Sequence, residues 1–380
     1  MEHVAGMKIL LASAYQPGDY SFGAAQRTTL LRDALARHGE VNTLILREGE
    51  VLSCQTAPRP DIVANISYPA RDLFQKYGNV AEIVPLLSQH LDLDAYDLVA
   101  GRYLAPLLTL PAFRGRAVID ADDAYYRYPP SSPRITARWI AQAKTVARTM
   151  ISRRALHRRA DHTWFCCERD HALFGLPAAS VLPNVAPIHT ASETPAPTEA
   201  PVVVLVGALW YRPNRDALEW FITHCWPRVR KHYPQARFRA VGAAPPALRE
   251  QWARHTGVEC PGFVPDLAAE YRAATLTIAP ITTGGGTQIK VLESLAHGRV
   301  PVVSSFVASG FAPLLRGGES LIVADGADDT VRAVLNVMDD PSATHAIVRH
   351  GQARVAEFFS VAHFNRVVAD TVAALAGRRA

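Results

Sequence analysis

The sequence predicts an α/β protein made of two doubly wound domains, each with a parallel sheet covered by helices. Short apolar runs alternate with helical patterns along the chain, as in strands joined by crossover helices. The length of 380 residues is long for one compact domain and ordinary for two. A segment rich in Pro, Ala and Thr, at 187–200, has neither periodicity and is typical of a linker.

The individual elements follow from these patterns in chain order. Apolar runs in the first half predict strands at 8–14, 41–46, 96–101 and 117–122. Runs in the second half predict strands at 202–208, 237–243, 258–264, 276–280 and 300–305. A helical pattern over 24–39 follows the first strand and ends at Gly39, which suits a helix C-cap. An amphipathic helix at 364–377 closes the chain and fits either domain.

The linker sets the expected domain boundaries. We expect an N-terminal domain over 1–186, a linker over 187–200 and a C-terminal domain over 201–361. The C-terminal helix, about 362–380, is a candidate to pack back onto the N-terminal domain. Open parallel sheets bind ligands at the carboxyl ends of their strands. The two domains are therefore expected to face each other across a ligand-binding cleft.

Composition restricts the class of protein. Apolar residues make up 49% and charged residues 20%, an ordinary globular mixture. The net charge of +5 suits anionic ligands without requiring nucleic acid. The five cysteines include no CxxC pair, which predicts free thiols in a reducing cytoplasm. The apolar run at 9–14 is too short for a signal peptide, and no run approaches the length of a membrane-spanning helix.

The stretch TIAPITTGGGTQIKVLESLAHGRVPVVSS, at 277–305, carries the clearest chemistry. Gly284, Gly285 and Gly286 are expected to turn from a strand into a helix over 287–297, where free amides and the helix dipole favour an anion. Lys290 can reach the same anion, and Glu293 can accept two hydrogen bonds from a sugar diol. The alternative is a plain turn with a solvated Lys–Glu pair. Neither a Walker A loop nor a GxGxxG motif is present.

A family resemblance extends this interpretation. The segments GALWYRPNRDALEWF and GVECPGFVPDLAAEYRAATLTIAPITTGGGTQIKVLESLAHGRVPVVSS resemble the donor-binding half of glycosyltransferase family 4, in particular its bacterial polysaccharide sugar-transferase branch. The likeness is strong over about 200–312 and weak elsewhere. It implies the GT-B fold and a metal-independent, retaining transferase that uses a nucleotide-diphosphate sugar as donor and needs no cofactor.

The resemblance also implies roles for residues of the second half. Glu293 matches the second glutamate of the family's E-x7-E element, which binds the donor ribose, whereas Gly285 stands where the first glutamate is expected. Backbone amides from Gly285 to Thr287 are candidates to replace that glutamate. Lys290 is the first candidate to stabilise the departing diphosphate, and Arg212, in the loop after Gly207, is the second. The alternative for Arg212 is a surface arginine.

Further candidates lie in other loops. Phe263 and Val264, in PGFVPD, resemble the loop that contacts the donor base, although an aromatic residue there is often part of the core. Gly23 and Arg27 resemble the glycine loop that faces the donor phosphate and the acceptor. The acceptor-side candidates are Asp122 and Asp123, and the alternative is that one of them caps a helix. Glu168 matches another family position but reads more simply as a helix start.

A basic stretch at 134–159 predicts a further partner. It contains no Asp or Glu, several arginines and regularly spaced apolar residues, so it is expected to contact an anionic membrane or to be a helix with a solvated basic face. The acceptor implied by the resemblance is a glycan or a lipid-linked sugar. No carboxylate can be placed beneath the anomeric carbon, which favours front-face attack. A sugar-nucleotide epimerase that uses His297 and a non-catalytic homologue remain the alternatives.

Overall fold

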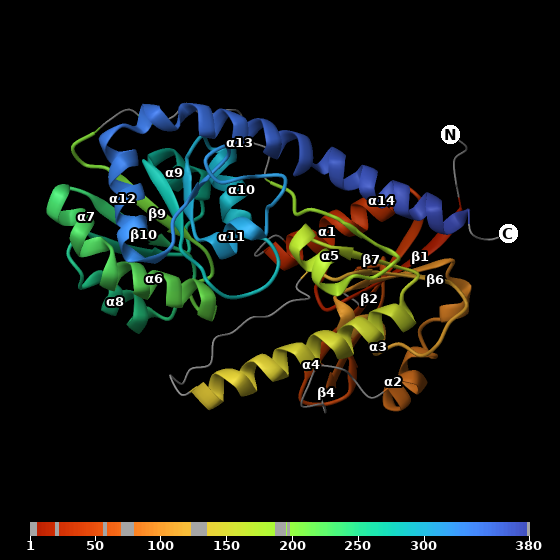
Figure 1. The fold of residues 1–380 in the computed structure, drawn as a ribbon. Helices are drawn as coiled ribbons and strands as arrows, with labels where there is room; N and C mark the ends of the chain where they lie inside the picture. Colours follow the sequence, from red (N-terminus) through yellow and green to blue (C-terminus); the bar gives the residue numbers. More distant parts are fainter. Residues whose placement is uncertain are drawn as a thin grey trace. The chain divides into compact units, whose positions relative to one another are not determined.

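A computed structural model describes residues 6–19, 23–55, 59–69, 80–122, 135–186, 195 and 198–377. It divides into two compact units (Figure 1). The N-terminal domain comprises Met1–Asn184 together with Val361–Ala380, and the C-terminal domain comprises Val185–Ser360. Most of the expected linker, including 187–194, lies outside the described residues. The chain therefore leaves the first domain, forms the second and returns.

The N-terminal domain is built on a sheet with strand order β3-β4-β2-β1-β5-β6-β7-β8. All neighbouring strands are parallel except β3, which pairs antiparallel with β4 at the edge. Residues 9–12 of the central strand are all buried, as expected for a strand covered on both faces. The strands are β1 (Met7–Ser13), β2 (Gly39–Gly49), β3 (Ser53–Gln55), β4 (Ile62–Pro69), β5 (Leu98–Arg102), β6 (Arg116–Asp120), β7 (His162–Phe165) and β8 (Ala179–Val181).

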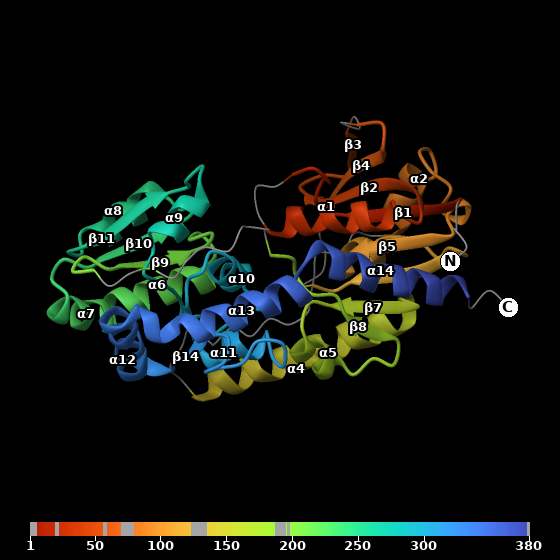
Figure 2. The ribbon, with the colours of Figure 1, turned by 90° about the horizontal axis from the view of Figure 1, so that it is seen from above.

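The N-terminal domain also contains helices from both of its chain segments, one before and one after the C-terminal domain. They are α1 (Gly23–Leu35), α2 (Val80–Leu87), α3 (Leu104–Leu108), α4 (Ile135–Arg159), α5 (Glu168–Phe174) and α14 (Val361–Ala376). Figures 1 and 2 show α14 lying beside α1. The indole of Trp164 on β7 donates to Thr371 Oγ1 at 3.0 Å. The last helix therefore belongs to the first domain.

The C-terminal domain has a parallel sheet with strand order β11-β10-β9-β12-β13-β14. Its strands are β9 (Val202–Val206), β10 (Arg237–Val241), β11 (Val258–Gly262), β12 (Leu276–Ala279), β13 (Pro301–Val303) and β14 (Ile322–Val323). Its helices are α6 (Arg212–His224), α7 (Trp226–His232), α8 (Pro246–Ala253), α9 (Leu267–Ala273), α10 (Ile289–Ala296), α11 (Ser305–Ser309), α12 (Gly326–Asp339) and α13 (His345–Phe358). The packed rings of Phe221, Trp226 and Phe238 lie in its core, with centroids 4.8 Å apart between Phe221 and Phe238.

The predicted apolar runs all contain strands, but the structure adds β3, β4, β7, β8 and β14. These strands have two to eight residues, and most lack a continuous apolar run, so the sequence pattern does not single them out. Glu168 begins α5, as its simpler interpretation predicted. All five cysteines are free. In the described ranges, no helix has both the length and the apolar character needed to cross a membrane.

Candidate active site

The strand order places a topological switch point in the C-terminal domain. From β9 the chain proceeds to β10 and β11 on one side, and then crosses to β12 and β13 on the other. The loops after the adjacent strands β9 and β12 therefore diverge at their carboxyl ends, which is where open α/β sheets bind ligands. Gly207 follows β9, and the glycines at 284–286 follow β12. Gly207 and the glycines at 284–286, which the sequence predicted as site residues, therefore lie at this switch point.

The glycine turn leads into α10, which begins at Ile289 rather than at the expected Thr287. Gly284 and Gly286 have φ of 121° and 66°, a backbone region that favours glycine. The helix N-cap is Gln288, whose side chain makes no capping hydrogen bond. Because the helix starts two residues later than expected, Lys290 lies in its first turn, close to the positive end of the helix dipole.

Lys290 is held at the junction of three segments. Its Nζ donates to Asn214 Oδ1 on α6 at 2.6 Å. A Cβ atom at Gly207 would lie 2.8 Å from the same Nζ, so any larger residue there would displace the ammonium from this position. Burial lowers the pKa of Lys290 to about 7, and the nearby Glu293 carboxylate opposes this effect. The site thus holds a poorly solvated cation, which favours an anionic ligand.

Glu293 lies three residues further along α10 and is anchored by a neighbouring helix. The hydroxyl of Tyr271 on α9 donates to Glu293 Oε2 at 2.7 Å. Burial raises the pKa of Glu293, while the Tyr271 hydrogen bond and Lys290 counteract the shift. In the described part of the chain, Oε1 has no hydrogen-bond partner and remains able to accept from a ligand hydroxyl.

Tyr271 itself is fixed by stacking. Its ring lies parallel to that of His297, with centroids 5.2 Å apart and an interplanar angle of 9°. His297 is buried and forms the C-cap of α10, at the opposite end of the helix from the glycine turn. The imidazole therefore supports Tyr271 and does not lie among the residues around Lys290, which weakens the epimerase alternative.

The other predicted residues of this domain lie on the surface or beside the core. Arg212 is the first residue of α6, is half exposed and pairs with Asp216 at 3.3 Å across one helical turn. This is the arrangement of its surface-arginine alternative. Phe263 follows β11 and is 75% exposed, so it is not a core aromatic. Val264 packs against a small core cluster. The side chain of Phe263 therefore stays available to a ligand.

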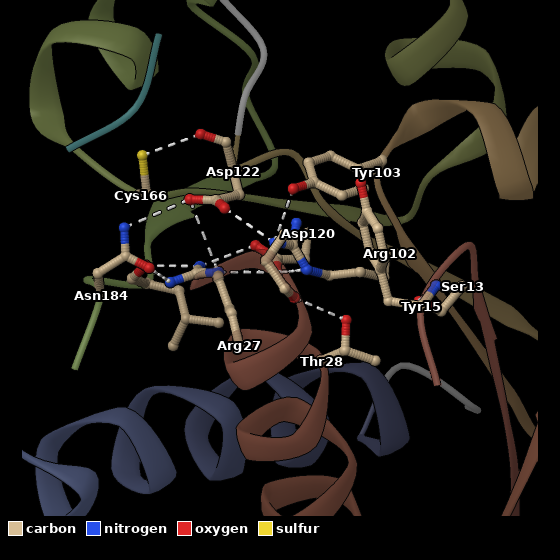
Figure 3. A network of polar contacts seen from close by, with 12 residues as sticks. Ser13, Tyr15, Arg27, Thr28, Arg102, Tyr103, Asp120, Asp122, Cys166 and Asn184 are labelled. Carbon is tan, nitrogen blue, oxygen red and sulfur yellow. Dashed lines mark hydrogen bonds and ion pairs between the residues drawn. The ribbon is translucent and has the colours of Figure 1, made fainter. Parts of the chain in front are cut away.

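In the N-terminal domain, Arg27 is enclosed by its own domain rather than presented to a ligand (Figure 3). It is 2% exposed on α1 and forms a two-pronged pair with Asp120, with contacts of 2.8 and 2.9 Å. Its remaining N–H groups donate to Asn184 Oδ1 and to the carbonyls of Leu182 and Pro183. All five guanidinium donors are therefore used, and the predicted contact with a donor phosphate would require breaking these bonds.

Asp122 is likewise held by arginines. Arg102, at the end of β5, donates to Asp122 Oδ2 at 2.8 Å, and Arg27 Nε lies 3.8 Å from Oδ1. Burial raises the pKa of Asp122, but Arg27 and Arg102 outweigh it and the net pKa is lowered. A carboxylate stabilised in this way is a weak proton acceptor. Asp122 therefore fits a positioning role better than that of a general base.

The same corner of the sheet contains the strained backbone of the N-terminal domain. Tyr103 has φ of 68°, rare for a non-glycine residue, and Arg102 lies over its ring at 3.9 Å. Tyr103 also meets Tyr15 edge to face, with centroids 6.0 Å apart. Since β1 and β5 are neighbours whose following loops diverge, this is the switch point of the first sheet. Gly23 begins α1, the helix that follows β1 in the chain. Asp123 lies outside the described residues.

One group of potential metal-ligating side chains lies among the described residues. Cys166, Cys167 and Asp170 are buried together, with ligand atoms within 4.8 Å of one another. However, a hydrogen bond with Cys167 and burial raise the pKa of the Cys166 thiol, which donates to the backbone carbonyl of Asp122 at 3.1 Å. Among the described residues this cluster is a packed thiol pair.

Several site residues were missed by sequence. Asn214 stands in the segment RPN, Tyr271 in the helical segment AAEYRAA, and Arg102 and Asp120 at ends of apolar runs. Of these residues, Arg102 and Asp120 could have been selected from sequence, because polar residues at strand ends lie at the ligand-binding edge of a parallel sheet. Asn214 and Tyr271 gave no comparable signal.

Comparison with known proteins agrees with this geometry. Residues 200–340 match the family model described as glycosyl transferases group 1. A comparison with curated protein sequences finds no match. Among solved structures, the sucrose-phosphate synthase from Thermosynechococcus elongatus matches with a TM-score of 0.69 and 16% identity, over 98% of this chain and 100% of that one.

Two further structures match over nearly the whole chain. HepE from Anabaena, in complex with UDP-glucose, has a TM-score of 0.63 and 16% identity, over 97% of this chain and 100% of its own. WaaG, a glycosyltransferase involved in lipopolysaccharide biosynthesis, has a TM-score of 0.62 and 15% identity, over 95% and 98%. The chain has the GT-B fold. Together with the family match, the GT-B fold supports a glycosyltransferase.

Proposed function

We propose that this protein is a retaining glycosyltransferase that moves a sugar from a nucleotide-diphosphate donor to a glycan or lipid-linked acceptor. The observation that carries the proposal is the arrangement of Lys290 and Glu293 at the start of α10, beside the glycine turn of the β9/β12 switch point. The ammonium suits the diphosphate, and the carboxylate suits the ribose diol. HepE, of the same fold, is described in complex with UDP-glucose.

The proposed mechanism is front-face transfer. Negative charge builds up on the diphosphate as it leaves, and Lys290 together with the α10 amides lowers the barrier by stabilising that charge. The departing phosphate oxygen accepts the proton of the acceptor hydroxyl, so no protein base is required. This agrees with Asp122, whose carboxylate is held by Arg27 and Arg102. No cofactor or metal takes part in the proposed chemistry.

The decisive experiment is a transfer assay with a panel of nucleotide sugars. Lys290→Ala is expected to lower turnover by about 10²–10³-fold, the range typical of one lost charge-stabilising group. Glu293→Ala is expected to lower kcat/KM for the donor, mainly through a raised donor KM, because it removes the acceptor for the ribose diol. Lys231→Ala and Glu250→Ala remove an exposed lysine and glutamate of the same domain and should leave turnover unchanged. Wild-type rates in both site variants would refute the assignment.

Two properties of the reaction need separate measurements. NMR of the first-formed product should show the anomeric configuration of the donor, and an inverted product would reject the retaining mechanism. Turnover should persist in excess EDTA, since the cationic stabilisation comes from Lys290 rather than from a metal ion.

A cytoplasmic enzyme of cell-surface polysaccharide or glycolipid synthesis needs access to membrane-bound acceptors, and α4 offers a surface for this. Val146, Met150 and Ile151 are large apolar side chains that are 50%, 66% and 50% exposed. Arg154 and Arg158, on the same helix, are also exposed. Exposed apolar and cationic side chains on one helix suit peripheral contact with an anionic bilayer.

A further inference from the structure

Asn214 connects the segments that meet at the Lys290 ammonium. It lies on α6, is 6% exposed and makes two side-chain hydrogen bonds in opposite directions. Its Nδ2 donates to the Ala208 carbonyl at 2.9 Å, and its Oδ1 accepts from Lys290 Nζ at 2.6 Å. Because a carbonyl only accepts, the first bond fixes the amide orientation and directs Oδ1 towards the lysine.

We propose that Asn214 is a positioning residue that holds the Lys290 ammonium at the carboxyl ends of β9 and β12 for the donor diphosphate. The inference rests on the proposed function, which gives Lys290 its role. A neutral amide suits this task better than a carboxylate. It orients the ammonium through a hydrogen bond but leaves the positive charge uncompensated for the ligand.

Among the described residues, the charged groups around Lys290 do not replace the hydrogen bond that Asn214 accepts from it. Glu293, on the same helix, acts electrostatically on the lysine, but one of its oxygens is occupied by Tyr271 from α9. From α6, Arg212 is half exposed and paired with Asp216. In the described part of the chain, Asn214 is the side chain that bonds the ammonium directly, and this uses one of its three protons.

A lysine titration tests the contact without any ligand. The chain has only five lysines, so the ¹³C-labelled lysine side chains can be resolved by NMR and the Lys290 signal assigned with Lys290→Met. Asn214→Leu removes the acceptor and should lower the titration midpoint of Lys290 by about one pH unit. Asn214→Asp adds a carboxylate and should raise it by at least as much.

The matched control is Asn336→Leu, an exposed asparagine on α12. It should leave the Lys290 midpoint unchanged. A merely structural role for Asn214 predicts that both site variants leave the midpoint in place or shift it in the same direction, and that result would overturn the inference. Asn214→Asp preserves the shape of the side chain, so the test survives if Asn214→Leu fails to fold.

Binding of UDP supplies an independent readout. In Asn214→Leu, the loss of UDP affinity should be about tenfold at pH 7.5 and should shrink at pH 5.5, where the lysine regains its proton. In Asn214→Asp, the loss should persist at both pH values because the added carboxylate cancels the charge. Unchanged UDP affinity at both pH values in Asn214→Leu would contradict the inference.

Failure of the proposed function is distinguishable from failure of this inference. If UDP, GDP, ADP and dTDP all fail to bind the wild-type protein while the opposed lysine shifts are observed, the proposed function fails and only the orientation of the Lys290 ammonium by Asn214 stands. If transfer occurs but the two variants do not shift the lysine in opposite directions, the positioning role fails and the function stands.

Discussion

At the scale of single residues, the candidate site depends on a cation that the fold leaves poorly solvated. Burial lowers the pKa of Lys290 to about 7, far below the value of about 10.4 for a free lysine. Between these values the unfolded chain binds more protons than the folded one, so the stability of the ligand-free protein should rise with pH in this range. A bound diphosphate reverses the preference, because it stabilises the ammonium.

The affinity for UDP should therefore fall above pH 7 by about tenfold per pH unit, until the pKa of Lys290 in the complex is reached. Calorimetric titration from pH 6 to pH 9 measures this slope. Lys290→Arg keeps its charge throughout this range and should flatten the profile. A wild-type profile that is equally flat would show that the ammonium does not contact the diphosphate.

Sequence located Lys290 and Glu293 because residues near one another in the chain, after a glycine turn, create a local pattern. Asn214 could not be found in this way, since its contact with Lys290 spans 76 residues. The same limit applies to Arg27. The family resemblance implied a charge facing the donor phosphate, whereas the structure pairs this arginine with Asp120, 93 residues away in the chain.

At the scale of elements, the loop after β9 must approach α10 closely enough for Asn214 and Lys290 to meet. Gly207 has φ of 153°, and an added Cβ would lie 2.7 Å from Asn214 Nδ2 and 2.8 Å from Lys290 Nζ. The turn therefore requires glycine both for its backbone and for the space that the ammonium occupies.

Gly207→Ala should lower UDP affinity at least tenfold as well as destabilise the protein by about 1–2 kcal/mol. Gly326→Ala is a matched control, because Gly326 has φ of 72° but no atom within 4 Å of the added Cβ. It should show a comparable destabilisation with normal affinity. Thermal denaturation and UDP titration of both variants measure the two effects, and unaltered binding in Gly207→Ala would count against the close packing around Lys290.

The exposed face of α4 permits a second test at this scale. The double variant Met150→Glu, Ile151→Glu replaces apolar contacts with charges that anionic lipid repels. It should lose most of the wild-type co-sedimentation with vesicles of phosphatidylglycerol, whereas Leu173→Glu, at an exposed position of α5, should not. Wild-type binding should weaken with salt. Binding that salt leaves intact would argue against an electrostatic contact.

At the scale of the whole molecule, the alternation of apolar runs and helices was sufficient to predict two parallel sheets, because buried strands have continuous apolar sequences. Short strands such as β7, HTWF, were missed because their burial depends on neighbours supplied by distant segments. The hydrophobic pattern also could not show to which domain the last helix belongs. An amphipathic pattern shows that one face is buried but not against which domain.

The structure assigns that helix to the N-terminal domain, and this has a measurable consequence. Phe364, Val368, Val372 and Leu375 of α14 are all buried. Each contributes about 1.5–3 kcal/mol, so their combined loss is comparable with the stability of a whole domain, about 5–15 kcal/mol. A chain ending at Ser360 should therefore contain an unfolded N-terminal domain, while the C-terminal domain retains its core and the proposed nucleotide site. Calorimetry should show one transition in place of two, and UDP should still raise the melting temperature of the remaining one.

A chain ending at Gly377 serves as the control and should behave like the wild type. Loss of UDP binding together with both transitions would show instead that the two domains do not fold independently.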